Sequence, residues 1–212
     1  MKETSRSAAR MQLSPRKVPR QSRSEQMRAD LLEAATRVLH RLGAQAFTTN
    51  RVAEAAGVSV GSLYQYFPNK AALLIALHEH EAEQTWQHLA PLLASAELSP
   101  RQRFEQLVTA FFDIQGQAQA QHDALHGADA TPSSTPAFLA FEQKVVAELS
   151  AFLQGALAKP PDECEFLAQF TFTVVTSIGE RLAARSAPHA SMQRMGATAA
   201  RMLATELGLS AT

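Results

Sequence analysis

The sequence lacks the features of a secreted, metal-stapled or membrane protein. It has one cysteine, Cys164, among 212 residues, so it can form neither an internal disulfide nor a cysteine-rich zinc site. No run of 18 consecutive apolar residues is present, so no segment is predicted to span a bilayer. The N-terminus also lacks the apolar core of a signal peptide. These absences predict a cytoplasmic protein with no membrane partner.

Glycine and proline are scarce as well, with 9 and 10 residues, and aromatic residues make up 7% of the chain. Few breakers among many helix formers predict an all-α fold. The sequence contains no Gly-rich phosphate loop, no nucleophile elbow, no HExxH motif and no Cys–His pair. We therefore expect a protein that is not an enzyme and that needs no cofactor.

The charges, by contrast, are present but separated by sign. The net charge is formally zero, yet residues 1–70 contain 12 Lys and Arg against 5 Asp and Glu, and the remaining residues contain 8 against 15. This asymmetry predicts an anionic partner for the first third of the chain. Nucleic acid is the leading candidate, because Lys and Arg neutralise phosphates and release counterions.

Helical spacing of apolar residues begins at Glu25 and is expected to end at Gly43. Residues 1–24 before it are rich in Arg and Ser, which predicts a basic flexible arm; a transit peptide is the alternative, but no amphipathic pattern supports it. Two short helices and one long helix are then predicted over 51–56, 59–66 and 69–91, followed by helices that start at Ser99 and that cover 138–152, 162–187 and 191–207. Residues 170–174 alternate like a strand, but no partner strand is visible, so a helix is favoured.

The two short helices have the spacing of a helix-turn-helix, at about residues 48–67. A small residue, Ala53, allows two helices to cross closely, Gly57 suits the tight turn, and Leu63 anchors the second helix on the core. The outer face of that second helix is small and polar and carries no carboxylate. Such a face suits the major groove of DNA, where an acidic residue would meet phosphate.

Here the sequence resembles the TetR family of bacterial transcriptional repressors. The resemblance rests on Ala34-Ala35 with Leu39 and Gly43, on Phe47-Thr48-Thr49, on Val52-Ala53-x-x-Ala56-Gly57-Val58-Ser59, and on Gly61-Ser62-Leu63-Tyr64-x-Tyr66-Phe67-x-Asn69-Lys70. It implies a three-helix DNA-binding domain over residues 25–85. A long helix would join this domain to a larger helical effector-binding and dimerisation domain over residues 86–212.

The resemblance also implies which residues touch DNA. Phosphate contacts would come from Thr48, Thr49 and Lys70, base edges would face the second short helix, and the tyrosines would reach either. The implied set is Thr48, Thr49, Ser59, Val60, Gly61, Ser62, Tyr64, Gln65, Tyr66 and Lys70. Since most of these side chains have little hydrogen-bonding capacity, direct readout is expected to rest on Gln65, with DNA shape or the basic arm adding the rest. Tyr64 and Tyr66 could instead be packing residues.

Two further sites are predicted in the second domain. Bulky apolar side chains on the middle helices would enclose a small hydrophobic effector: Trp86, Phe104, Phe111, Phe112, Phe138 and Phe141. The last two helices would form a four-helix bundle with a second copy of the chain: the residues are Phe170, Val174, Ile178, Leu182, Met195 and Met202. In each case the alternative is that these residues belong to the ordinary hydrophobic core of a monomer.

One histidine pair has a spacing that can bind a metal. His122 and His126 are four residues apart, but the sequence supplies no third ligand, so no metal is expected. The sequence as a whole predicts a ligand-responsive repressor that binds a palindromic DNA operator as a homodimer and is released by its effector. The alternative is a helical adaptor or small-molecule-binding protein that does not touch DNA.

Overall fold

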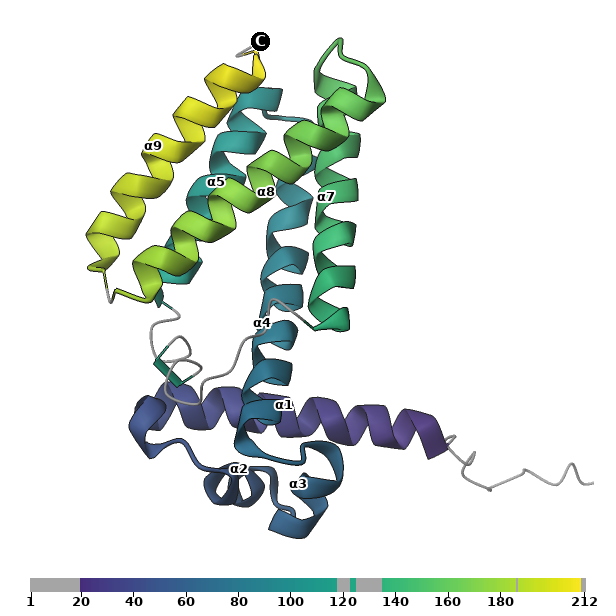
Figure 1. Ribbon diagram of the computed structural model, residues 1–212, viewed down its shortest axis with the longest axis vertical. Helices are drawn as coiled ribbons and strands as arrows, with labels where there is room; N and C mark the ends of the chain where they lie inside the picture. Colours follow the sequence, from purple (N-terminus) through teal and green to yellow (C-terminus); the bar gives the residue numbers. More distant parts are fainter. Residues whose placement is uncertain (1–19, 118–122, 125–134, 186, 211–212) are drawn as a thin grey trace, which may run out of the picture.

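The computed structural model is built of helices arranged in two lobes (Figure 1). It describes residues 20–117, 123–124, 135–185 and 187–210, and no strand occurs among them. The N-terminal lobe holds α1 (Arg20–Ala46), α2 (Thr49–Ala56) and α3 (Val60–Tyr66). Helix α4 (Lys70–Leu93) rises from it into a second lobe formed with α5 (Pro100–Gln117), α7 (Pro136–Ala156), α8 (Pro161–Ala183) and α9 (His189–Leu207). The all-α fold with an N-terminal helix-turn-helix is confirmed.

Side-chain caps mark the starts of the short helices, and α2 begins at Thr49, two residues before the predicted start. Thr48 Oγ1 accepts a hydrogen bond from the backbone N–H of Arg51 at the start of α2, and Ser59 Oγ accepts one from Ser62 at the start of α3. Asn69 caps α4 in the same way. Each bond satisfies an N–H that the first turn of a helix leaves unpaired, so the local sequence defines where each helix begins.

Several predicted ends shift. Helix α1 begins at Arg20, so residues 20–24, expected within the flexible arm, are helical instead. The residue Gly43 does interrupt α1, with a non-helical φ of 72°. Helix α8 ends at Ala183, four residues earlier than predicted, and α9 begins at His189, two residues earlier. Residues 1–19, His122 and His126 lie outside the described residues, so the rest of the arm and the histidine pair stay predictions.

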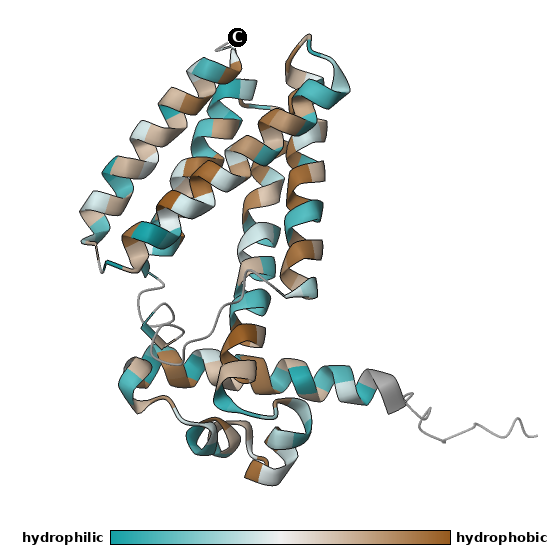
Figure 2. Ribbon diagram, in the orientation of Figure 1, coloured by the Kyte–Doolittle hydropathy of each residue, from teal (hydrophilic) through white to brown (hydrophobic). Residues whose placement is uncertain are grey.

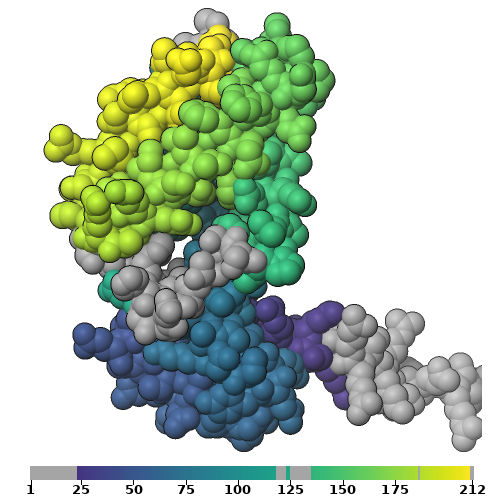
Figure 3. All heavy atoms as spheres, viewed as in Figure 1, coloured from purple at the N-terminus to yellow at the C-terminus, as the bar shows by residue number. Residues whose placement is uncertain are grey.

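Each lobe has its own hydrophobic core, and α4 contributes to both. In the N-terminal lobe, Leu73, Leu74 and Leu77 of α4 are fully buried against α1–α3. Figure 2 shows the hydrophobic N-terminal part of α4 crossing α1. In the second lobe, Trp86 and Leu89 of the same helix join the core made with α5 and α7–α9. The space-filling view shows the two lobes stacked along the long axis of the molecule (Figure 3).

Within the residues that the structure describes, no helix is long and apolar enough to cross a membrane.

The closest helix pairing of the second lobe is between α5 and α9. Gly196 of α9 lies so near Phe112 of α5 that a Cβ added to the glycine would fall 2.6 Å from the Cβ of the phenylalanine. Phe112 is fully buried, so it has no space into which to retreat. The absence of a side chain at residue 196 is therefore a packing requirement.

We accordingly expect Gly196→Ala to destabilise the protein by about 1–3 kcal/mol, because it overpacks the α5–α9 contact. Gly155→Ala is the matched control, since Gly155 is also within a helix but has nothing within 4 Å of its added Cβ. That change should be neutral or stabilise by up to about 1 kcal/mol through helix propensity. Urea unfolding of both variants measures the difference, and equal stability of the two would contradict the packing argument.

Candidate nucleic-acid interface and cavity

Helices α2 and α3 form a compact corner whose geometry follows from three residues. Ala53 and Leu63 are buried at the crossing, where a larger residue than Ala53 would separate the helices. Gly57 has a left-handed φ of 69°, and its N–H bonds back to the end of α2. The corner therefore presents α3 as a rigid, short helix on the surface of the N-terminal lobe.

The exposed side of α3 carries no acidic residue. Ser59, Gly61, Tyr64 and Gln65 are exposed, and Val60, Ser62 and Tyr66 are half-buried. Two of these also serve the fold, because Val60 and Tyr66 pack against the core of the lobe. The exposed Gln65 amide is therefore available on this helix as a side-chain donor and acceptor.

Hydroxyl groups around α3 are partly engaged within the protein. Ser59 Oγ and Ser62 Oγ share a hydrogen bond of 2.8 Å. Thr49 Oγ1 lies 3.2 Å from Tyr64 Oη, so one hydrogen bond joins α2 to α3. This last bond holds the exposed Tyr64 ring beside the start of α2. Thr49 and Tyr64 thus form one polar edge rather than two separate contacts.

Cationic groups flank the corner. The Lys70 ammonium lies 5.6 Å from the centre of the Phe47 ring, which positions the first turn of α4. Arg51, which the sequence analysis did not single out, is exposed near the start of α2, and its Nη1 donates to the carbonyl of Ala46 at 2.7 Å. The sequence signal for Arg51 is its position two residues after Thr49, which places a cationic side chain in the first turn of the helix expected to contact phosphate. Lys70 and Arg51 give the corner a positive rim.

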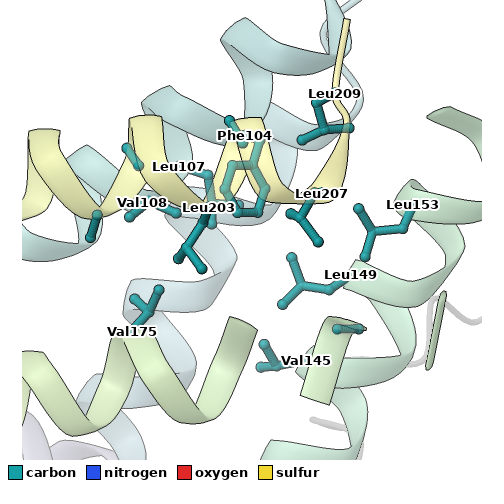
Figure 4. Packing of buried hydrophobic residues seen from close by; sticks show 14 of the residues in the cluster. Phe104, Leu107, Val108, Val145, Leu149, Leu153, Val175, Leu203, Leu207 and Leu209 are labelled. Carbon is teal, nitrogen blue, oxygen red and sulfur yellow. The ribbon is translucent and has the colours of Figure 1, made fainter. Parts of the chain in front are cut away.

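A cavity of about 140 Å³ lies in the second lobe among α4, α5, α7 and α8. Four residues of the predicted effector set line it: Trp86, Phe111, Phe138 and Phe141. The other two, Phe104 and Phe112, do not line this cavity. Phe104 packs beside Leu107, Leu203 and Leu207 in the core (Figure 4), and Phe112 faces Gly196 of α9.

The cavity also contains polar side chains that sequence reasoning missed, among them His78, Glu81, Gln115, Thr171 and Glu180. Burial raises the pKa of the Glu81 carboxyl, although a 3.2 Å hydrogen bond from Thr36 Oγ1 and the nearby His40 act in the opposite direction. Burial raises the pKa of Glu180 too. No local motif marks these residues, because only the packing of four helices brings them together.

Large apolar side chains are exposed on α8 and α9. Phe166 is 66% exposed and Met202 is 68% exposed, and the predicted interface residues Phe170 and Met195 are also exposed. Three more residues of the predicted set, Val174, Ile178 and Leu182, are half-buried against the core. These exposed apolar residues, Phe166 and Phe170 of α8 and Met195 and Met202 of α9, together called the exposed face of α8 and α9, are suited to burial against another molecule.

Metal ligands do not gather in this part of the chain. Among the described residues, no group of three or more His, Cys, Asp or Glu side chains could hold a metal ion.

Comparison with known proteins places the corner in a family. Residues 31–77 match the family model described as "Bacterial regulatory proteins, tetR family". The chain is 33% identical over 96 residues to the HTH-type transcriptional regulator BetI of Burkholderia thailandensis, and this match covers 45% of the chain and 49% of BetI. A match to BetI of Paraburkholderia phytofirmans is 30% identical and covers 46% and 50%. The chain thus matches about half the length of these curated relatives.

Solved structures share the whole fold. A protein of Mesorhizobium loti MAFF303099 assigned to the TetR family superposes with a TM-score of 0.63 at 17% identity, and the match covers 87% of this chain and 98% of that one. A TetR transcription regulator of Haloarcula marismortui gives a TM-score of 0.62 at 16% identity, with 86% and 98% covered. Likeness at this level of identity concerns the fold alone.

Substitutions of two neighbouring residues, Phe111 and Phe112, distinguish a cavity-lining ring from a core ring. Phe112→Ala should destabilise the protein by about 3–5 kcal/mol, because it empties a fully buried site. Phe111→Ala should cost clearly less, because Phe111 is half-buried and already borders empty space. Denaturant unfolding of the two variants measures this, and a larger loss for Phe111→Ala would contradict the assignment of the two rings.

Proposed function

Since residues 31–77 match the tetR family of bacterial regulatory proteins, we propose that the chain is a ligand-responsive transcriptional repressor of this family. In this proposal a homodimer binds a palindromic DNA operator through α2 and α3, and a small effector in the cavity of the second lobe releases it. We propose no catalytic role. The cytoplasm, where the bacterial chromosome lies, is then its place of action.

The DNA-binding surface of the proposal is the corner formed by α2 and α3. Helix α3 enters the major groove, where the Gln65 amide suits the N6 and N7 atoms of adenine. Thr48, Thr49, Arg51 and Lys70 lie toward the phosphates at the rim. Tyr64 adds a contact beside Thr49, while Ser59, Val60, Gly61, Ser62 and Tyr66 shape the surface that faces the groove. The remaining discrimination comes from DNA shape.

The observation that carries the proposal is the double role of α4. Its first turn holds Lys70 at the DNA-facing corner, and the same helix lines the cavity with Glu81 and Trp86. Glu81 also accepts the hydrogen bond from Thr36 of α1. About 16 residues separate Lys70 from Trp86, or about 24 Å along the helix. A tilt of α4 therefore changes the position of α3 in one protomer relative to its partner.

The homodimer in this proposal forms through the exposed face of α8 and α9. One helix-turn-helix reads only half an operator, so two copies are needed to contact successive major grooves about 34–36 Å apart. A two-fold interface brings the same patch from both copies together. The four exposed residues Phe166, Phe170, Met195 and Met202 support this arrangement, since they would leave water when two copies meet.

The DNA upstream of the protein's own gene is the first target to test, by electrophoretic mobility shift and by binding-site selection. Lys70→Ala should weaken binding to all sequences alike and lower the salt slope by about one unit. Gln65→Ala should instead relax preference at one base position per half-site, by about 1–3 kcal/mol. Lys159→Ala, on the far side of the second lobe before α8, is the control and should change neither.

An unchanged salt slope in folded Lys70→Ala would remove Lys70 from the interface. The same selected sequence for wild type and Gln65→Ala would remove the proposed base contact. Failure of the wild-type protein to prefer any sequence over random DNA would favour the alternative, a helical adaptor or small-molecule-binding protein.

The dimer face has a test of its own. Met202→Glu should shift the protein from dimer to monomer, because it places a charge within the proposed contact. Leu139→Glu is the matched control: Leu139 is 48% exposed but lies on α7, away from this face. Analytical ultracentrifugation distinguishes the two, and a Met202→Glu dimer as tight as wild type would place the interface elsewhere.

A further inference from the structure

The cavity has a polar end and an apolar end. In Figure 1, α4 and α7 run away from the N-terminal lobe, whereas α5 and α8 run back toward it. The lining residues nearest the N-terminal lobe are therefore the early ones of α4 and α7 and the late ones of α5 and α8. The polar side chains among them are His78, Glu81, Gln115 and Glu180, and the Phe138 ring stacks on His78 at this same end. At the opposite end lie Leu89, Leu107 and Leu149. A ligand that fills this cavity must be amphipathic.

The polar end is negatively charged. Glu81 and Glu180 line it, and no Lys or Arg is among the lining residues that the structure describes. Thr36 donates to the Glu81 carboxylate, whereas within the described part of the chain the Glu180 carboxylate has no side-chain hydrogen bond or ion pair. Glu180 lies at the mouth of the cavity, where the residue is exposed to solvent. Burial raises the pKa of both carboxyls, so each would gain from a cation.

An enclosed hydroxyl adds an independent sign that the cavity is a binding site. Thr171 lines the cavity and is only 3% exposed, and its Oγ1 makes no hydrogen bond with any described residue. A buried hydroxyl without a partner is costly. A ligand with a polar atom along its length would satisfy this group, whereas a purely hydrocarbon ligand would leave it unpaired.

The walls between the two ends are aromatic. Trp86, Phe111, Phe138, Phe141 and Phe172 all line the cavity. Aromatic faces attract cations as well as apolar groups, so these walls suit both parts of an amphipathic cation. A volume of about 140 Å³ is close to that of cavities known to hold a benzene-sized molecule. The ligand is therefore small, with about one ring and a short chain.

We propose that the cavity binds a small amphipathic cation, with its charged group facing Glu81 and Glu180 and its apolar part among the aromatic walls. The inference rests on the proposed function only for its regulatory meaning, because binding itself is independent of DNA. It makes the effector predicted from the sequence more specific. The predicted ligand is still apolar over most of its surface, but it also carries one positive charge.

The same placement gives the cation a route to the DNA-binding lobe. The Glu81 carboxylate that would face the ligand is the acceptor of the bond from Thr36 of α1. A cation competes with the Thr36 hydroxyl for that carboxylate, and the contact between α1 and α4 is then weakened. The ligand thereby acts on the joint between the lobes, and not only on the upper part of α4.

Three probes of similar shape test whether the cavity prefers a cation. They are 4-phenylbutylamine, 4-phenylbutan-1-ol and 4-phenylbutanoate, whose polar groups are positive, neutral and negative. Calorimetry on the full-length protein, with Trp86 emission as a second readout, should show that the amine binds at least about tenfold more tightly than the alcohol. The carboxylate should bind most weakly. An amine that binds no better than the alcohol, or not at all, overturns the proposal.

Substitutions of Glu81 and Glu180 then test where the charged group of the ligand binds. Glu180→Gln and Glu81→Gln keep the side-chain shape and one acceptor oxygen while removing the charge. Each should reduce the preference for the amine over the alcohol, and the double variant should reduce it to about threefold or less. Glu165→Gln, an exposed residue of the same helix as Glu180 that does not line the cavity, should leave it unchanged. A full preference retained by the folded double variant contradicts the placement.

Operator release is measured separately. If the amine binds as expected but does not release DNA, the cavity assignment stands and the repressor mechanism fails. If the protein shows no sequence preference on DNA in the absence of any probe, the proposed function fails while the cavity assignment is still decided by calorimetry.

Discussion

Helix α4 is the element on which both lobes depend. Leu73, Leu74 and Leu77 fill the core of the N-terminal lobe, and Trp86 and Leu89, on the same unbroken helix, belong to the core of the second. A helix is stiff over this length because each peptide is hydrogen-bonded to the next turn. Neither lobe can therefore repack around α4 without moving a residue that the other lobe buries. This shared helix is the physical basis for communication in the proposed regulator.

The N-terminal lobe could be predicted because its signals are local. Thr48, Ser59 and Asn69 cap the helices that follow them, and Gly57 takes the left-handed turn between α2 and α3. Each signal acts within a few residues, so the sequence alone carries it. The start of α1 was missed because Arg and Ser in residues 20–24 are typical of a solvated arm and also occur on a helix whose sides face water.

The cavity could not be predicted at the same level. Phe111 and Phe112 are neighbours with the same side chain, yet one lines the cavity and the other is a core residue against Gly196. The difference of about 100° between successive helical positions decides which is which, and it depends on how α5 is rotated against α9. Glu81 and Glu180 are 99 positions apart in the chain, so their shared end of the cavity is a property of the packing. Charged residues on amphipathic helices otherwise read as solvent-facing.

Gly61 is a position on α3 where a larger residue can be accommodated. It is exposed on the first turn of α3, and a Cβ added there would meet only Ser59 Oγ, at an ordinary distance of 3.8 Å. Its φ is not left-handed, so a larger residue would cause no backbone strain. Replacing glycine within a helix also favours folding by about 0.5–1 kcal/mol. If α3 reads DNA as proposed, a lineage of this protein can acquire a new DNA-reading side chain at this position without disturbing the core, and its DNA target can diverge while the fold stays the same.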